Sequence, residues 1–344
     1  MPDKGNAPKW LNLFNSYKAK FLMPKGSGLS RKSASLRNLK IGVLLGGTSP
    51  EREISIKSGQ AVAQALAARG CTVSLIDPAD FPGNRCVFGD IDAAFVALHG
   101  EGGEDGFIQK QLERKGIPYT GSSPRGCALS LDKDKAKKVF RRSGIPTPDS
   151  RLMTTHNFER ILKSFPAPFF VKPPQDGSSL GIFQVENASE SRAGIRQALR
   201  RYRRLLIERK IEGREFTVGV LGSKALPVIE LRPKAAFYDY QTKYTKGRCD
   251  YHVPAPIPAA LTRKLQRLAL AVHKVLELRD FSRTDIMVDG QGRPFVLEAN
   301  AIPGFTALSL VPKAAAHAGI PFENLCERLL KYAVRRGRAL SAKR

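Results

Sequence analysis

The chain has 344 residues, of which 42% are hydrophobic, and a formal net charge of +26. This length and composition predict a globular protein of two or three domains with a sizeable core. They argue against a disordered chain and, because no apolar run approaches the ~18 residues needed to cross a bilayer, against a membrane-spanning protein.

The N-terminus lacks a continuous apolar core followed by a cleavage site, so we do not expect secretion. The five cysteines are scattered without a C-x-x-C pair. This favours structural thiols in a reducing cytosol over a disulfide framework or a zinc site, and predicts a cytoplasmic protein. The five are Cys71, Cys86, Cys127, Cys249 and Cys326.

Residues 1–38 form a basic extension: the first 40 residues carry nine Lys or Arg against one acid. Gly, Ser, Pro and Lys dominate it, which favours a disordered, solvated tail. Nonspecific contact with anionic membrane or nucleic acid, or a transit-like segment, are the alternatives. Basic stretches at 196–210 and 328–344 have helical spacing and predict solvated helix faces, and residues 339–344 form a short basic tail.

Residues 39–121 are predicted to form a Rossmann-like parallel α/β domain. Strand signals at 41–45, 73–76 and 93–98 alternate with helical stretches. After the first strand, the segment Thr48-Ser49-Pro50-Glu51 predicts a helix start with Glu51 as a capping-box acid.

The glycine-rich turn at 100–106 follows His99 at the carboxyl end of a strand. Ligands bind at that edge of open α/β sheets. We expect a ligand there, although a satisfied histidine at a strand end is the alternative for His99.

A second unit, residues 122–208, contains the strand 169–172 and a loop running from Pro173 to Gly181. Two glycines, two hydroxyls and the preceding Lys172 suit the phosphates of a nucleotide, although the loop matches no standard phosphate-binding motif. A plain hairpin connector with a solvent-seeking lysine is the alternative. Lys133 lies in a lysine run of the kind that usually faces solvent.

The third unit, residues 209–338, contains Asp285 and the segment Val296-Leu297-Glu298-Ala299-Asn300, with a turn-like Asp289-Gly290-Gln291-Gly292 between them. On neighbouring antiparallel strands, the two acids and the Asn300 amide oxygen would converge, which suits Mg²⁺ held with a nucleotide phosphate. A surface hairpin is the alternative, but apolar flanks make an uncompensated carboxylate costly there.

Taken together, several segments resemble the D-alanine–D-alanine ligases of the ATP-grasp superfamily. They occur in the family's order and span nearly everything from residue 41 to 330. The segments are LLGGTSPEREIS (44–55), ALHGEGGEDG (97–106), PYTGSS (118–123), SLDKDKAK (130–137), VKPPQDGSSLG (171–181), LIERKIEGREFTV (206–218), FYDYQTKY (237–244), RTDIMVD (283–289) and LEANAIPGFTALSLVP (297–312).

The resemblance implies a three-domain ATP-grasp ligase whose second and third domains, both α+β, sandwich ATP. ATP would phosphorylate one D-alanine, and the amine of a second would attack the acylphosphate. Two Mg²⁺ or Mn²⁺ would be held by Asp285, Glu298 and Asn300. The ATP-binding residues it implies are Lys133, Lys172, Ser178, Ser179, Glu208, Arg209, Ile211 and Glu215.

The resemblance also implies where the substrates bind. The first D-alanine would meet Glu51 and His99, and the oxyanion would meet Arg283 and the backbone of Gly304. The second D-alanine would meet Lys243, Ser309 and Leu310. Ser178 and Tyr244 would join Glu51 in a hydrogen-bonded triad that closes a lid and excludes water. A homodimer is implied as well.

Two departures from the family pattern bear on specificity. Where relatives commonly read N-T-x-P-G-M-T-S-H-S, residues 300–309 read NAIPGFTALS, which loses a hydroxyl and a histidine near the second-substrate pocket. Arg209 stands where a lysine is usual and keeps its charge but not its shape.

We therefore predict D-alanyl-D-alanine synthesis for peptidoglycan. A ligase that uses D-lactate or D-serine as acceptor is the close alternative, and Tyr244 favours D-alanine. A basic nucleic-acid-binding protein on an inactive ligase scaffold is the alternative from another class. It predicts loss of the metal-binding acids, and both are present.

Overall fold

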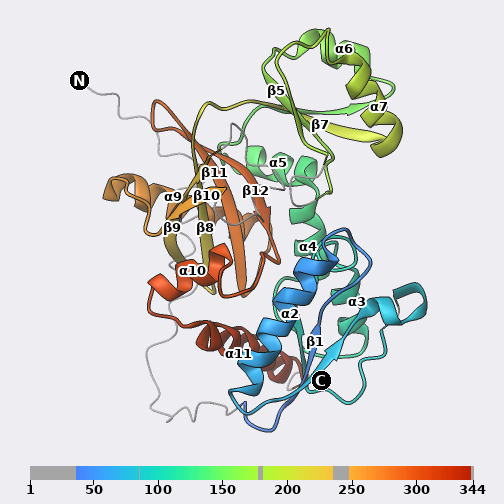
Figure 1. Cartoon of the computed structure of the whole chain (residues 1–344), viewed down its shortest axis with the longest axis vertical. Helices are drawn as coiled ribbons and strands as arrows, with labels where there is room; N and C mark the ends of the chain where they lie inside the picture. The colour runs from blue at the N-terminus through green and yellow to red at the C-terminus, as the bar shows by residue number, and fades with distance from the viewer. Residues whose placement is uncertain (1–35, 85, 177–180, 235–247, 342–344) are drawn as a thin grey trace.

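The computed structural model describes residues 36–84, 86–176, 181–234 and 248–341. Within these ranges the chain forms three sheets (Figure 1): a parallel one near the N-terminal end of the chain and two antiparallel ones. The predicted fold class, a parallel α/β domain followed by two α+β domains, is confirmed. Most of the N-terminal extension lies outside the described residues, as do Ser178, Ser179, Lys243 and Tyr244.

The first sheet is parallel, in the order β2–β1–β3. Its strands lie within two residues of the predicted ones: β1 (Lys40–Leu44), β2 (Thr72–Ile76) and β3 (Ala93–Val96). β1 and β3 are almost wholly buried, as expected of a parallel sheet covered by helices. α2 (Arg52–Ala67) packs on β1 and β2, and the C-terminal helix α11 (Phe322–Ser341) packs on α2 and β3.

The turn after β1 requires glycine. Gly46 has φ +77°, and a Cβ there would lie 2.2 Å from Oδ2 of Asp77. Asp77 also accepts the backbone N–H of Gly47 at 2.8 Å. This turn carries the chain into α2.

The predicted capping box at the start of α2 is wrong. Glu51 is itself the N-cap residue, and its side chain makes no capping hydrogen bond. Ser49 Oγ instead accepts the Glu51 N–H at 3.2 Å and donates to the His99 carbonyl at 2.7 Å. Glu51 is thereby held beside the carboxyl end of β3.

The central sheet is antiparallel, in the order β4–β7–β5–β6. Helices α6 (Phe158–Ser164) and α7 (Arg192–Tyr202) flank it, and apolar side chains from both helices and the strands form one core. Its strands are β4 (Ser150–Thr154), β5 (Phe169–Lys172), β6 (Phe183–Val185) and β7 (Arg204–Arg209).

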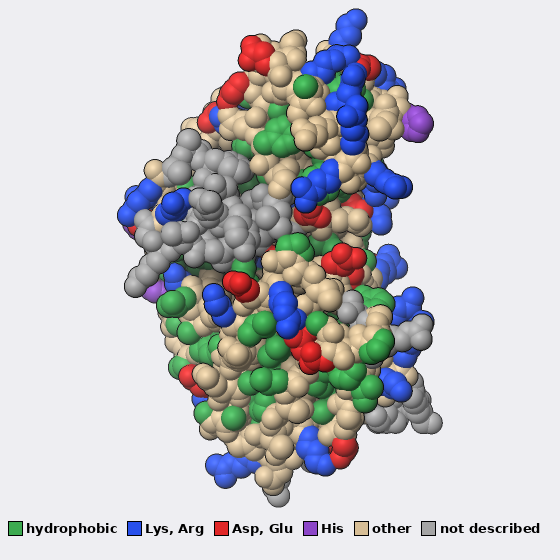
Figure 2. All heavy atoms as spheres, turned by 45° about the vertical axis from the view of Figure 1, so that its right-hand side comes forward, with side chains coloured by type: hydrophobic (Ala, Val, Ile, Leu, Met, Phe, Trp, Pro, Cys, Tyr) green, Lys and Arg blue, Asp and Glu red, His purple; other side chains and the backbone are tan. Residues whose placement is uncertain are grey.

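The basic stretch 196–210 is only partly helical, contrary to the sequence prediction. α7 ends at Tyr202, Arg203 has φ +60°, and β7 begins at Arg204. The apolar run Leu205-Leu206-Ile207 is buried in the sheet, and that burial overrides the helical spacing. The helical part does present arginines to solvent, and Figure 2 shows many Lys and Arg side chains on the upper part of the molecule.

The third sheet is antiparallel, in the order β10–β9–β8–β11–β12. One face packs on α9 (Ala259–Val275); α10 (Leu310–His317) also contacts β8 and β9. On β8, Phe216 and Val218 belong to the core that includes α9, whereas Leu221 belongs to the core that includes α10. The strands are β8 (Gly213–Leu221), β9 (Lys224–Pro233), β10 (Cys249–His252), β11 (Phe281–Asp289) and β12 (Pro294–Asn300).

Three shorter helices connect the sheets. α3 (Phe107–Arg114) follows the glycine-rich turn, and α4 (Pro124–Leu131) contacts both α3 and β12. α5 (Lys133–Arg142) packs against α9, β12 and β4, so it touches the third and the central sheets at once. Side chains of α5 can therefore reach the space between these sheets.

All five cysteines are buried, and none of them forms a disulfide within the part of the chain that the structure describes. Across the described residues, no helix combines the length and the apolar character that a bilayer crossing demands.

Candidate active site

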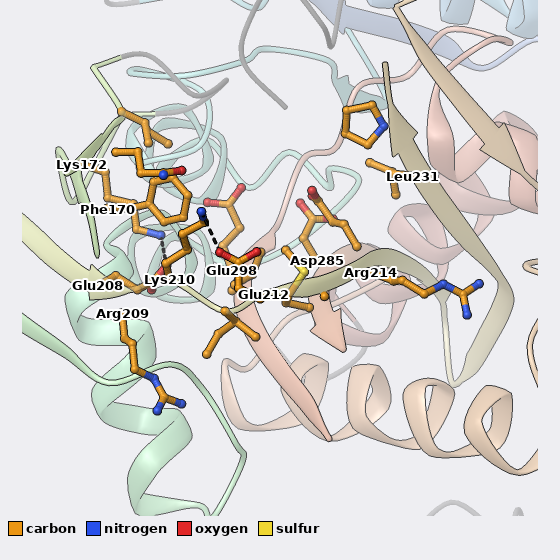
Figure 3. Close-up of a pocket in the computed structure, with 18 of the residues that line it drawn as sticks. Phe170, Lys172, Glu208, Arg209, Lys210, Glu212, Arg214, Leu231, Asp285 and Glu298 are labelled. Carbon is orange, nitrogen blue, oxygen red and sulfur yellow. Dashed lines mark hydrogen bonds and ion pairs between the residues drawn. The ribbon is translucent and has the colours of Figure 1, made fainter. Parts of the chain in front are cut away.

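A cavity of about 560 Å³ lies between the central and the third sheets. Lys172 of β5 and Glu208 of β7 line one side, and Asp285 and Glu298 of the third sheet line the other (Figure 3). The connection from β7 to β8 also contributes to its wall. The cavity therefore brings together residues that are more than 100 positions apart in sequence.

The predicted acids stand opposite each other in the third sheet. β11 and β12 are antiparallel, with Asp285 paired to Glu298 and Arg283 paired to Asn300. Because directly opposed residues share a face, and because side chains two apart on a strand do too, all four lie on one face. The sequence prediction that the acids occupy neighbouring strands is confirmed.

A β-bulge sets this register. Glu298 pairs with Asp285, but Val296 pairs with Ile286, so Leu297 is the extra residue. Val296 and Ile286 are in the core with α9, whereas Glu298 and Leu297 line the cavity. The bulge thus directs Glu298 toward the cavity while Val296 stays in the core.

Protein cations compensate both acids. Asp285 receives two hydrogen bonds from the Arg283 guanidinium, at 2.9 and 2.8 Å, and one from Thr217 Oγ1 at 2.6 Å. Glu298 Oε2 lies 3.2 Å from Nζ of Lys133. The sequence predicts a metal as the compensating charge, and in the structure Arg283 and Lys133 supply positive charge at the same place.

The donor set suits a hard divalent cation. Two carboxylates and an amide on one face offer oxygen ligands, which Mg²⁺ and Mn²⁺ prefer. Asn300 Nδ2 approaches Asp285 Oδ2 at 3.5 Å, so its amide lies next to the acid pair. Among the described residues, no three or more His, Cys, Asp or Glu side chains cluster so that they could hold a metal ion by themselves.

Lys133 and Lys172, both predicted to meet phosphates, are each only 7% exposed. Lys133 Nζ donates to the backbone carbonyl of Asp176 at 2.8 Å, at the start of the glycine-serine loop. Lys172 Nζ donates to Glu208 Oε1 at 2.5 Å. The two lysines thus bring positive charge to the cavity from α5 and from β5.

Glu208 is a buried carboxylate that pairs with two lysines, Lys172 and Lys137. Burial alone would raise the pKa of Glu208, but the charges and hydrogen bonds of Lys137 and Lys172 hold it below its usual value. Glu208 is therefore ionised at neutral pH.

Three further residues predicted to bind ATP line the cavity, whereas Ser178 and Ser179 lie outside the described residues. Ile211 and Glu215 lie on its wall. Arg209 lines it too, but its guanidinium packs 5.8 Å from the ring centroid of Phe295, and Figure 3 shows the side chain directed away from Lys172. In this orientation, the Arg209 guanidinium would interact with a bound nucleotide from beside Phe295.

The residues predicted for the first substrate gather at the edge of the parallel sheet. Glu51 and His99 are both buried, and His99 Nδ1 lies 3.4 Å from Glu104 Oε1. Burial raises the pKa of Glu104, opposed by the hydrogen bond with His99; the charge of Glu51 raises it further and that of Arg283 lowers it. Glu51, His99 and Arg283 are therefore close enough to one another that all three influence the pKa of Glu104.

The segment predicted for the oxyanion and the second substrate connects to this group. A Cβ on Gly304 would lie 3.3 Å from Ser309 Oγ, which accepts the Thr306 N–H at 3.0 Å. The Phe305 N–H donates to Ser58 Oγ at 3.2 Å, and Ser58 Oγ lies 3.3 Å from His99 Nε2. Leu310 is the first residue of α10 and Ser309 is its N-cap, but the Ser309 side chain makes no capping hydrogen bond to the helix.

The sequence analysis missed Glu104 and Lys137. Glu104 lies in the glycine-rich turn that was singled out as a whole, and its pairing with His99, five positions away, was the available signal. Lys137 lies one helical turn after Lys133, so the two share a helix face. A solvent-facing lysine run is the alternative given for Lys133, yet Lys133 and Lys137 are buried while Lys135 and Lys138 are more than half exposed.

Comparisons with known proteins agree with this geometry. A family model described as "D-ala D-ala ligase C-terminus" matches residues 139–331. A D-alanine–D-alanine ligase of Alkalilimnicola ehrlichii is 43% identical over 292 residues, which are 85% of this chain and 93% of that protein.

Solved structures also resemble the chain. The D-alanine–D-alanine ligase from Bacillus anthracis complexed with ATP has a TM-score of 0.76 and 32% identity, covering 88% of this chain and 99% of that one. The VanG D-Ala:D-Ser ligase from Enterococcus faecalis has a TM-score of 0.74 and 28% identity, covering 86% and 99%.

The fold and the cavity between the two antiparallel sheets are those of an ATP-dependent ligase of the ATP-grasp class. Within that class, the chain belongs to the D-alanine–D-alanine ligase family.

Proposed function

We propose that this protein joins two D-alanines into D-alanyl-D-alanine for peptidoglycan, through a D-alanyl phosphate formed from ATP. The observation that carries the proposal is the opposition of Asp285 and Glu298 at the cavity, with Arg283 hydrogen-bonded to Asp285. Sequence identity of 43% to a D-alanine–D-alanine ligase, over most of both chains, supports the same reaction.

The reaction brings a carboxylate to a triphosphate, so charge repulsion is its main obstacle. Lys133 and Lys172 supply positive charge at the cavity before any ligand binds. Arg283 lies beside the acid pair, where a guanidinium can stabilise negative charge that develops on the transferred group. Charges placed in advance need no reorganisation during the reaction.

Asp285, Glu298 and Asn300 are proposed to hold two Mg²⁺ or Mn²⁺. When bound, these ions would neutralise phosphate charge and polarise the phosphoryl oxygens. The protein's own part is to keep Arg283 and Thr217 hydrogen-bonded to Asp285, which fixes the orientation of that carboxylate.

We assign the first D-alanine to the site beside Glu51 and His99. Glu51 is buried at the N-terminus of α2, where a carboxylate can pair with the ammonium group of the amino acid. Glu104 and Ser58 hold the His99 ring from its two nitrogens, so His99 has a fixed orientation. The backbone of Gly304 is proposed to meet the oxyanion.

We assign the second D-alanine to Ser309, Leu310 and Lys243, and closure of the site to the triad of Glu51, Ser178 and Tyr244. The last two and Lys243 lie outside the described residues. Closure would exclude water, which otherwise hydrolyses the acylphosphate.

D-Serine is the acceptor to weigh against D-alanine. The structural likeness to a D-Ala:D-Ser ligase and the changed residues Ala301, Ala307 and Leu308 favour testing it. Leu308 is 79% exposed, so its side chain is available to a ligand. The cytoplasm is part of the proposal as the location, because the substrates are cytoplasmic precursors. A homodimer, which the family resemblance implies, is part of it as the assembly.

The test measures phosphate release from ATP and Mg²⁺ with D-alanine alone, and with D-alanine plus D-serine or D-lactate, and identifies products by mass. We expect turnover with D-alanine alone and D-alanyl-D-alanine as the main product. A mixed product that dominates when D-serine is present would assign the alternative acceptor. A folded sample without turnover on any of these would refute the proposal.

A further inference from the structure

Lys137 is a charged side chain enclosed by protein. It is 0% exposed, it pairs with Glu208, and its Nζ lies 2.7 Å from Oγ1 of Thr147. Thr147 Oγ1 donates in turn to the backbone carbonyl of Val296 at 2.7 Å. The ammonium group is thereby fixed between β7 of the central sheet and β12 of the third sheet.

The two lysines on Glu208 are not equivalent. Lys172 lines the cavity, whereas Lys137 is absent from its lining and lies behind Glu208. Lys172 can therefore turn toward an anionic ligand, and Lys137 cannot. If Lys172 were the only cation on Glu208, turning away would leave a buried carboxylate without a countercharge, which is strongly unfavourable.

We propose that Lys137 is a positioning residue that serves as the permanent countercharge of Glu208 and so frees Lys172 to contact the nucleotide. The inference rests on the proposed ATP site. Glu208 neutralises only one of its two lysines, so one positive charge remains in excess beside the cavity. Lys172, which lines the cavity, can present that charge to a nucleotide phosphate or ring nitrogen.

The protonation states agree with this arrangement. Burial lowers the pKa of Lys137 to about 8, and the charge of Glu208 opposes that shift. The lysine therefore stays mainly protonated at neutral pH despite complete burial. Glu208, whose pKa is held below its usual value, carries the matching negative charge.

The experiment compares Lys137→Met, Glu208→Gln and the double variant with the wild type, in ATP titrations by calorimetry and in steady-state kinetics. Lys137→Met should weaken ATP binding and raise KM for ATP about tenfold, because Lys172 is then needed on Glu208. KM for D-alanine should change less than about twofold. In the Glu208→Gln background the same substitution should have little effect on ATP binding, because no charge remains to be compensated.

Lys138→Met is the matched control, since Lys138 is the next residue of the same helix, is half exposed and pairs with Asp134. It should leave ATP affinity unchanged. Lys137→Gln, which keeps a polar group near Thr147 without the charge, tests whether charge or hydrogen bonding matters. It should resemble Lys137→Met.

Several results would overturn the inference. One is a Lys137→Met protein that is less stable but binds ATP within about twofold of wild type. Another is an equal loss of affinity with and without the Glu208 charge. If neither single variant of Lys137 folds, rescue of folding by Glu208→Gln supports the countercharge and lack of rescue contradicts it. Failure of the proposed function is distinguishable, because the wild type would then show no ligation while ATP binding still tests Lys137.

Discussion

Val296 and Glu298 lie two positions apart on β12 yet face opposite sides of the sheet. In a regular strand they would share a face. The bulge at Leu297 separates them, so Val296 packs with α9 while Glu298 stands opposite Asp285 at the cavity. Because Leu297 is an extra residue in β12, the strand can place Glu298 at the cavity while Val296 keeps its contacts in the core.

Glu298→Gln should remove most of the activity. The substitution keeps the size of the side chain and deletes the charge that a divalent cation would require. We expect D-alanine-dependent phosphate release to fall about 100-fold or more. Glu323→Gln, at an exposed acid of α11, is the control and should behave as wild type. Activity of Glu298→Gln within a factor of three of wild type would argue against its role.

Arg283→Ala should lower kcat/KM about 100-fold, because the guanidinium is proposed to stabilise charge on the transferred group. Arg283→Lys should restore only part of the activity, since a lysine cannot make both hydrogen bonds to Asp285. Arg293→Ala, in the exposed β11–β12 turn, is the matched control. Full activity of Arg283→Ala would contradict the assignment.

Stability should decline in mild acid because of His273. Burial lowers the pKa of this histidine from 6.5 to about 4. Below pH 6.5 His273 becomes protonated in the unfolded chain, whereas in the folded chain it stays neutral until about pH 4. The contribution of neutral His273 to the free energy of unfolding is therefore fully present above pH 6.5 and is lost as the pH falls toward 4. The loss amounts to at most about 3 kcal/mol.

Urea unfolding at pH 7, 6, 5 and 4.5 measures this effect on the free energy of unfolding. His273→Gln should flatten the slope between pH 6.5 and 4.5, and His156→Gln, at an exposed histidine, should leave it as in wild type. Equal slopes for wild type and His273→Gln would show that the decline has another source.

Arg336 should be important for stability. Its guanidinium bonds Asp280 at 2.7 and 2.9 Å and the Tyr119 carbonyl at 2.6 Å, so it ties α11 to the start of β11 and to the parallel sheet. Arg336→Ala leaves the buried Asp280 without this partner and should cost about 3 kcal/mol. Arg335→Ala, its exposed neighbour, should cost less than about 0.5 kcal/mol. Equal unfolding free energies for the two variants would refute this role.

Much of the fold followed from local patterns. The three parallel strands and the β11–β12 hairpin were predictable because apolar runs ended in glycines or polar turns. The bulge at Leu297 was not, since it depends on which residues pair across strands. The prediction that the stretch 196–210 is helical throughout failed for a similar reason. Its helical spacing continues into β7, and the burial of β7 in the sheet, which depends on tertiary packing, ends the helix earlier.

The site was predictable where residue types were unusual for their surroundings. Asp285 and Glu298 stood out as acids between apolar residues. Lys137 did not, because in a run of lysines only tertiary packing decides which ones are buried. Glu104 was likewise hidden among other acids of the same turn, and its burial beside His99 is a property of the folded loop.

The central claim is that divalent cations are held at the paired acids of β11 and β12. Crystals grown with a non-hydrolysable ATP analogue and Mn²⁺ test it directly through anomalous scattering. The account predicts manganese peaks in contact with Asp285, Glu298 and Asn300, beside the phosphates. A map with the nucleotide bound in the cavity and no such peak near these side chains would contradict it.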